Sequence, residues 1–177
     1  MAPNRRILIV GGPGAGKTTL LAELAALGHT CVPDSARAII RARKLRGLTP
    51  RPDPPEFAFE ALRMDIDQYR ATPADGGFVF FERGIPDALG MLDALGVLTP
   101  ADVGRYLTEF PYSRRVMVLP PWEEIYCTDD ERDQTFREAV RVHEAVCDWY
   151  PRCGYELAEV PRVSAKARCD FVLRTLA

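Results

Sequence analysis

The sequence has neither a marked excess of charge of one sign nor a long apolar run. Its 177 residues include 23 Lys and Arg against 25 Asp and Glu, a formal net charge of −2, so the composition gives no support for a nucleic-acid-binding surface. No run approaches the roughly 18 apolar residues of a membrane-spanning helix. The apolar run that follows Met1–Arg6 is too short for a signal peptide. We therefore expect a cytoplasmic protein that binds neither nucleic acid nor membrane.

Cysteine and histidine are too few and too scattered to indicate a metal centre. The five cysteines form no Cys-x-x-Cys pair, and the two histidines, His29 and His143, have no zinc-ligand spacing with them. The odd number of cysteines favours free thiols in a reducing compartment. A catalytic cysteine is an alternative that the motif patterns do not favour.

One glycine-rich stretch has a pattern with a specific chemical meaning. From Gly11 to Thr18 the sequence fits Gly, four residues, Gly-Lys-Thr. The stretch follows the apolar run Ile7–Val10 and precedes Thr19–Leu27, which is predicted to be a helix. Strand, glycine-rich loop and helix N-terminus in this order are typical of a phosphate-binding loop. A plain turn before a helix is the alternative, and the Lys and Thr argue against it.

Such a loop binds the phosphates of a nucleotide through its backbone. Glycines reach conformations closed to other residues, so successive N–H groups converge on one anion at the positive end of a helix. We expect Lys17 to reach the β- and γ-phosphates and the Thr18 hydroxyl to ligate Mg²⁺. The predicted nucleotide-binding residues are Gly11, Gly12, Pro13, Gly14, Ala15, Gly16, Lys17, Thr18 and Thr19.

Strand and helix signals alternate along the whole chain. The predicted strands are Arg5–Val10, His29–Pro33, Phe78–Phe81, Arg115–Leu119 and Tyr155–Val160, and helices are predicted between and after them. This alternation implies a single α/β domain, 1–177, with a parallel sheet and right-handed crossovers. Ligands of such sheets lie beyond the carboxyl ends of the strands.

Two carboxylates at predicted strand ends are candidates for chemistry. Glu82 follows Phe78–Phe81 in the arrangement of a Walker B acid, with Glu in place of the usual Asp, and Asp34 follows the second strand. One could support Mg²⁺ while the other accepts a hydroxyl proton. The sequence does not assign the two roles, although kinase precedent favours Asp34 as the base and Glu82 on the metal side. Capping a helix is the alternative for either side chain.

Several arginines could bind phosphate or substrate. Arg83 could clamp an anion with two hydrogen bonds. Arg37 and Arg41 share a helix face that could meet an anionic substrate, although a solvated face is the usual setting of such charges. We interpret 120–137 as a lid whose Arg132 reaches the transferring phosphate, with a surface ion pair as the alternative. The predicted catalytic residues are Lys17, Asp34, Glu82, Arg83 and Arg132; the substrate-binding ones Asp34, Arg37, Arg41 and Arg83; the metal ligands Thr18 and Glu82.

A proline-rich segment separates two predicted helices. Four prolines between positions 50 and 55 make this segment a loop, either facing substrate or merely connecting elements at the surface. The next predicted helix is Pro55–Arg70, and we expect an acceptor to enter between it and the helix after Asp34. Its expected core face consists of Phe59, Leu62, Ile66 and Tyr69.

Several blocks of the sequence together resemble one family. They are the phosphate loop, Glu82-Arg83-Gly84 with Pro86-Asp87, Pro120-Pro121-Trp122 with Tyr126, Asp130-x-Arg132, Gly154-Tyr155 and Val160-Pro161. In combination they look like the small AAA-domain-labelled family of bacterial predicted ATPases, which resembles nucleoside and nucleotide kinases. The resemblance implies a three-layer P-loop NTPase fold with five parallel strands in the kinase-like order 2-3-1-4-5, helices on both faces and a lid.

The resemblance also assigns residues by position. Asp34 matches the acid that ends strand two in deoxynucleoside and nicotinamide-riboside kinases, Glu82 and Arg83 match their acid–arginine pair, and Arg132 matches the lid arginine. Strand two here supplies Asp where Glu is common, and Gly84 stands where deoxynucleoside kinases have Ser. The identity of the substrate therefore does not follow from the resemblance.

The sequence lacks the features of two related classes of protein, the GTPases and the ring-forming AAA+ motors. Asn4 is the only asparagine, so the guanine-reading Asn-Lys-x-Asp motif of GTPases is absent. The chain is too short for the extra helical domain of a ring-forming AAA+ motor. We therefore expect an ATP- and Mg²⁺-dependent phosphotransferase that acts on a small hydroxyl- or phosphate-bearing acceptor. A nucleotide-binding regulator or slow ATPase without such an acceptor is the open alternative.

Overall fold

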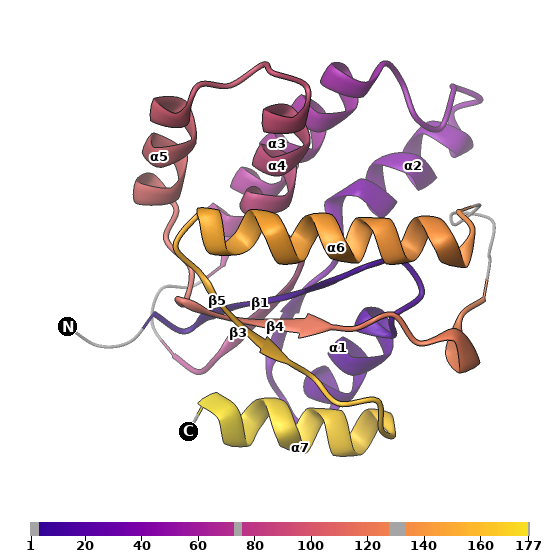
Figure 1. Ribbon diagram of the computed structural model, residues 1–177, viewed down its shortest axis with the longest axis vertical. Helices are drawn as coiled ribbons and strands as arrows, with labels where there is room; N and C mark the ends of the chain where they lie inside the picture. The colour runs from indigo at the N-terminus through magenta and orange to yellow at the C-terminus, as the bar shows by residue number, and fades with distance from the viewer. Residues whose placement is uncertain (1–3, 73–75, 128–133, 177) are drawn as a thin grey trace. The chain divides into compact units, whose positions relative to one another are not determined.

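Five parallel strands form one sheet in the computed structural model, which describes residues 4–72, 76–127 and 134–176 (Figure 1). The strands are β1 (Arg6–Gly11), β2 (Thr30–Val32), β3 (Val79–Glu82), β4 (Arg115–Leu119) and β5 (Glu156–Glu159). Their order is β2-β3-β1-β4-β5, and every neighbouring pair is parallel. The predicted P-loop NTPase fold and its strand order are confirmed.

The chain divides into two compact units. The first unit contains the whole sheet and comprises 1–32, 77–82 and 112–177, and the second comprises 33–76 and 83–111. The chain passes from the first unit to the second twice, between Val32 and Pro33 and between Glu82 and Arg83. The single domain, 1–177, stays a prediction.

Helices cover both faces of the sheet in the first unit (Figure 1). α6 (Phe136–Arg152) lies along one face, and α1 (Lys17–Ala26) and α7 (Ala165–Leu176), which pack against each other, lie along the other. A short 3-10 helix, η1 (Glu123–Ile125), follows β4. Because both faces are covered, the central strands are continuous apolar runs. Their core side chains include Ile7, Ile9, Phe80, Met117 and Leu119.

The second unit is helical. It contains α2 (Ser35–Leu45), α3 (Pro54–Ala71), α4 (Ile85–Ala94) and α5 (Pro100–Glu109), with α3 packed against both α4 and α2. α5 begins at Pro100, because Thr99 and Asp102 form a capping box with Pro100 in the first turn. α4 begins at Ile85, since Gly84 is its N-cap and a proline fits its first turn. Within the described residues, no helix is both long and apolar enough to cross a bilayer.

The expected core face of α3 is partly wrong. Leu62 is only 3% exposed, but Phe59 is 45% exposed. The buried stripe instead includes Ala58, Ala61 and Asp65. Large apolar side chains alone do not mark the buried face of α3, because two small residues and a buried acid make up much of it. Small side chains let neighbouring helices approach closely, and that approach leaves Phe59 at the edge of the stripe.

This placement predicts a contrast between two substitutions on α3. Leu62→Ala leaves a cavity in the core and should lower the free energy of unfolding by about 2–5 kcal/mol. Phe59→Ala should lower it by only about 1 kcal/mol, because nearly half of the side chain already contacts water. Urea denaturation of the two variants beside the wild type measures both changes. Equal losses would contradict the assignment of the face.

Candidate functional site

The loop between β1 and α1 has the backbone that phosphate binding requires. Gly14 and Gly16 have left-handed φ values of 75° and 86°, which residues with a Cβ rarely adopt. A Cβ on Gly12 would lie 2.3 Å from the Ala139 carbonyl oxygen of α6, so this glycine is required for packing. Within the described chain, α1 has no side-chain N-cap and no acid in its first turn. The helix itself therefore supplies no side chain that caps or neutralises its positive end.

Lys17 is buried within the loop that it follows. Its Nζ donates hydrogen bonds to the carbonyl oxygens of Gly12 at 2.8 Å and Gly11 at 3.2 Å. These bonds hold the ammonium group at the start of the loop. A buried positive charge there favours binding of an anion.

Thr18 and Glu82 lie together, as a metal site of this kind requires. The Thr18 Oγ1 is 3.0 Å and 3.1 Å from the two carboxylate oxygens of Glu82, which is buried at the end of β3. The β1–β3 register pairs Ile9 with Glu82 and so places the acid beside the end of the strand that leads into the loop. The capping alternative for Glu82 is wrong, because Gly84 caps α4.

Arg168 is a loop-binding residue that the sequence did not reveal. It lies on α7, is 3% exposed, and donates through Nη1 to the Ala15 carbonyl oxygen at 2.9 Å and through Nε to the Pro161 carbonyl oxygen at 3.2 Å. Its guanidinium carbon is 4.8 Å from the centre of the Trp122 ring. Burial, and to a smaller extent Arg162, lower the pKa of Arg168 from its ordinary value. The arginine therefore joins the phosphate loop to the segment after β5.

The segment after β4 covers part of the loop. A Cβ on Gly14 would lie 2.4 Å from the Tyr126 ring. That ring packs edge-on against Phe136 at 5.4 Å, and its hydroxyl donates to the Gln134 carbonyl oxygen. The predicted lid, 120–137, is thus described only in part. Arg132 lies outside the described residues, and its role stays a prediction.

In the second unit, the two oxygens of the Asp34 carboxylate contact different groups. Its Oδ1 accepts hydrogen bonds from the backbone N–H groups of Ala36 and Arg37, at 2.8 Å and 3.3 Å, so the side chain caps α2. Its Oδ2 lies 3.9 Å from Arg83 Nε. The capping interpretation is therefore correct, and it leaves one oxygen directed toward a cation. Of the other predicted substrate residues on α2, Arg37 is half-buried and Arg41 is exposed.

Arg83 has a strained backbone. Its φ of 62° is positive, which no other non-glycine residue of the described chain shows. A left-handed conformation costs about 1–2 kcal/mol for a residue with a Cβ. Strain of this kind persists where surrounding contacts impose it, and it is frequent at functional sites. Arg83 also directly follows Glu82, the last residue of β3.

Asp65 is the second residue that the sequence did not reveal. It lies on the buried face of α3, is 7% exposed, and shares a short hydrogen bond with the Ser35 hydroxyl. The pKa of Asp65 is raised from 3.8 to about 8, mainly by burial and also by the carboxylates of Asp87 and Asp34, against the opposing effects of the Ser35 hydrogen bond and Arg83. An acid in the apolar stripe of a helix was the available signal, and a pattern that expects charge at the surface overlooks it.

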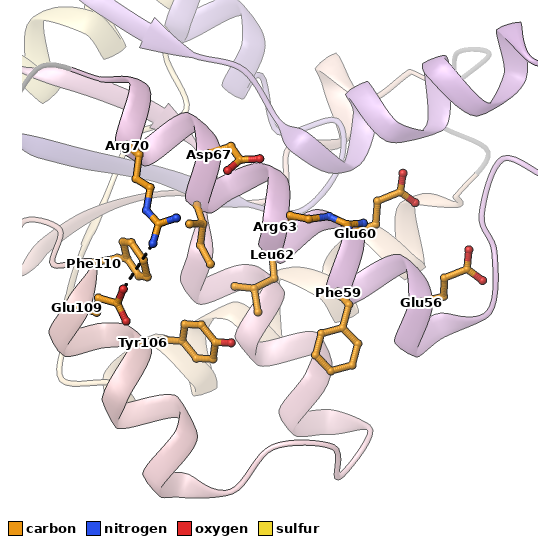
Figure 2. A pocket seen from close by; sticks show the side chains of 11 residues that line it. Glu56, Phe59, Glu60, Leu62, Arg63, Asp67, Arg70, Tyr106, Glu109 and Phe110 are labelled. Atoms are coloured by element: carbon orange, nitrogen blue, oxygen red, sulfur yellow. Dashed lines mark ion pairs between the residues drawn. The ribbon is translucent and has the colours of Figure 1, made fainter.

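A separate pocket of about 670 Å³ opens between α3 and α5 in the second unit (Figure 2). Arg70 pairs with Glu109 at 3.6 Å there and stacks over Phe110 at 5.3 Å. None of the predicted site residues lines this pocket. It also differs from the predicted acceptor entrance, which lies between α2 and α3. The pocket is therefore not the predicted acceptor site.

The cysteines and histidines carry no metal centre in the described part of the chain. All five cysteines are free thiols, as expected. Among residues 4–72, 76–127 and 134–176, no three His, Cys, Asp or Glu side chains gather as metal ligands.

The sheet order and the loop define a P-loop protein with the kinase fold. The chain belongs to the AAA-domain family, whose model matches residues 6–168. The resemblance noted in the sequence is thereby confirmed. A comparison with curated proteins gives no match.

Solved structures with the same fold include three kinases or related proteins. Deoxyadenosine kinase from M. mycoides with bound dATP is 14% identical with a TM-score of 0.63, covering 97% of this chain and 98% of its own. Thymidylate kinase from Candida albicans is 13% identical with a TM-score of 0.70, covering 98% and 91%. The NadR protein in complex with NR is 17% identical with a TM-score of 0.68, covering 98% and 50%. At these identities the likeness shows the fold alone.

The packing of Gly14 predicts a large effect of adding one methyl group. Gly14→Ala should destabilise the protein by the left-handed strain, about 1–2 kcal/mol, plus the displacement of the Tyr126 ring. Gly28→Ala is the matched control, since Gly28 has a φ of 89° but nothing within 4 Å of its added Cβ. Urea denaturation should therefore show a greater loss for Gly14→Ala. A loss no greater than that of the control would contradict the contact between Tyr126 and the loop.

Proposed function

We propose that the protein is a phosphotransferase that moves the γ-phosphate of ATP to a small hydroxyl- or phosphate-bearing acceptor in the presence of Mg²⁺. The observation that carries this proposal is the contact between Thr18 and the buried Glu82 carboxylate beside an uncapped, glycine-rich loop. Hydroxyl and carboxylate oxygens are the hard donors that Mg²⁺ prefers, and two of them suit an ion that keeps several waters.

The donor residues have separate tasks in this proposal. The backbone from Gly11 to Thr18, with Thr19 at the start of α1, binds the phosphates, and Lys17 neutralises their charge. Thr18 and Glu82 hold Mg²⁺, which when bound supplies positive charge to the phosphate oxygens. The adenine lies near the loop Pro161–Ser164, where Arg168 already fixes one carbonyl oxygen. Arg132 brings a further cation to the transferring group.

The acceptor side rests on Asp34 and Arg83. Asp34 accepts the proton of the acceptor hydroxyl while the oxygen bonds to phosphorus and the bond to the leaving oxygen of ADP breaks. Arg83 orients the Asp34 carboxylate and neutralises the charge that develops. Arg37 and Arg41 extend this positive surface toward an anionic acceptor.

The names of the structural neighbours agree with this class of reaction. Deoxyadenosine kinase and thymidylate kinase are nucleoside and nucleotide kinases by name, and each shares the whole fold with this chain. We carry over the reaction class and not the acceptor, because Asp34 and Gly84 depart from the pattern of the deoxynucleoside kinases. A nucleotide-binding regulator or slow ATPase is the outcome that the experiments below would favour if no acceptor is phosphorylated.

Nucleotide binding is predicted to depend on Lys17. Lys17→Ala should raise the dissociation constant for ATP with Mg²⁺ at least tenfold, since a hydrogen bond to a charged group contributes about 1.5–3 kcal/mol. Lys44→Ala removes the same charge from an exposed position on α2 and should leave the affinity unchanged. Isothermal titration calorimetry with ATP, ADP and GTP measures these constants. Absence of ATP binding to the wild type would remove the basis of the proposed function.

Substitutions of Asp34 and Glu82 are predicted to impair the reaction in different ways. In a panel of nucleosides, nucleotides, sugars and antibiotics, one acceptor should raise ADP release above the acceptor-free rate. With that acceptor, Asp34→Asn should lower kcat about 10²–10⁴-fold and leave ATP affinity intact, as expected for loss of a general base. Glu82→Gln should raise the Mg²⁺ concentration needed for half-maximal rate. Asp170→Asn, an exposed change on α7, serves as the control.

The panel also separates the two candidate functions. If no acceptor raises turnover while slow hydrolysis of ATP persists, the protein is an ATPase or a nucleotide-dependent regulator. If Asp34→Asn keeps the full transfer rate, Asp34 is only the cap of α2.

A further inference from the structure

A chain of three polar side chains fastens α3 to the segment that carries Asp34. The Ser35 hydroxyl lies within hydrogen-bond distance of Asp65 Oδ1 and, at 3.0 Å, of Gln68 Oε1. The Gln68 amide nitrogen lies 3.4 Å from the Pro33 carbonyl oxygen. Asp65 and Gln68 belong to α3, whereas Pro33 and Ser35 flank Asp34. These hydrogen bonds therefore hold the residues on both sides of Asp34, the proposed base.

The single hydroxyl proton of Ser35 limits which of these hydrogen bonds the serine can donate. A serine hydroxyl has one proton to donate and can also accept hydrogen bonds. Here it faces two oxygens, one from Asp65 and one from Gln68, and it can donate to only one of them. Either the other oxygen carries a proton of its own, or the Gln68 amide is rotated so that its nitrogen faces Ser35.

The Pro33 carbonyl oxygen selects between these arrangements. In the orientation described, the Gln68 nitrogen faces this carbonyl oxygen and can donate to it. Rotating the amide would place the Gln68 oxygen against the Pro33 oxygen, two acceptors with no proton between them. With the amide in this orientation, Ser35 donates to Gln68, and the proton between Ser35 and Asp65 belongs to Asp65.

We infer that Asp65 is a neutral carboxylic acid that donates its proton to Ser35 and thereby positions Asp34. The hydrogen bonds then run in one direction, from Asp65 to Ser35, from Ser35 to Gln68, and from Gln68 to Pro33. Each of these three hydrogen bonds then has one donor and one acceptor. Asp65 is thus a positioning residue, and its relevance to phosphoryl transfer rests on the proposed function of Asp34.

The charges around Asp65 favour its neutral form. α3 packs against α2 and α4, and the charged groups that act on Asp65 from these elements are Asp34 at the start of α2, Asp87 in α4, and Arg83 just before α4. Two acids and one guanidinium leave an excess of negative charge. Ionised Asp65 would add a third carboxylate away from water. Burial is the largest of the causes that raise the pKa of Asp65 from 3.8 to about 8, and Arg83 and a Ser35 hydroxyl donating to the ionised form act in the opposite direction.

This protonation predicts how stability depends on pH. Between its ordinary pKa of 3.8 and its folded value of about 8, Asp65 carries a proton in the folded protein and none in the unfolded chain. The free energy of unfolding therefore falls as pH rises across this window. The contribution of one proton is at most a tenfold change in the unfolding equilibrium constant per pH unit. Above about pH 8 the contribution of Asp65 no longer changes.

Asp65→Asn provides the test, because an amide keeps a neutral donor for Ser35 and cannot ionise. Urea denaturation at pH 5, 6, 7 and 8 should show wild-type stability falling relative to Asp65→Asn, by up to tenfold in the equilibrium constant per pH unit. Asp67→Asn, an exposed change on the same helix, should follow the wild type. Parallel curves for the wild type and Asp65→Asn would overturn the inference.

A second measurement needs no folded variant and reports on positioning. In wild-type protein labelled with ¹³C at aspartate, one carboxyl resonance should titrate near pH 8, and the backbone amide signals of Ser35 and Ala36 should shift with the same midpoint. Titration of every aspartate below pH 6 would overturn the neutral acid. Titration near pH 8 without movement of these amides would overturn positioning. Neither experiment uses a nucleotide or an acceptor, so failure of the proposed function leaves both results interpretable.

Discussion

A loop that offers its N–H groups to an anion must satisfy its carbonyl oxygens with donors from elsewhere, because it has no helix or strand ladder to pair them. Two cations meet this requirement in the first unit. Lys17 donates to the carbonyl oxygens of Gly11 and Gly12, and Arg168 donates to that of Ala15. Both cations are buried, so the charge that fixes the loop also raises its attraction for phosphate. The helices that supply them, α1 and α7, pack against each other.

The features predicted correctly are those that depend on short segments of sequence. The phosphate loop is defined by a few consecutive residues, and alternation of apolar runs with helices leads to a parallel sheet. Glu82 could be placed next to Thr18 because parallel strands end at one edge of a sheet. The strand order itself came from the family resemblance. The roles of Asp34, Arg83 and Arg132 in chemistry stay predictions.

Arg168 and Asp65 could not be found in this way, for one physical reason. Sequence patterns assign charge to the surface, since an unpaired buried charge is costly. A buried ionisable group is stable only with partners far away in sequence. Arg168 finds its partner at Ala15, and Asp65 finds its partner at Ser35. The same reasoning explains the error at Phe59, because the inward face of α3 is set by the helices that pack on it.

The backbone of Arg83 has a consequence for how this position can vary. Glycine would adopt the positive φ without the strain that arginine carries there. Replacing Arg83 by glycine would therefore relax the backbone and remove the guanidinium beside Asp34 in one step. Under the proposed function, the relief of backbone strain comes together with the loss of a cation that acts on the acceptor side. Position 83 is thus a place where thermostability and catalysis are expected to select opposite residues.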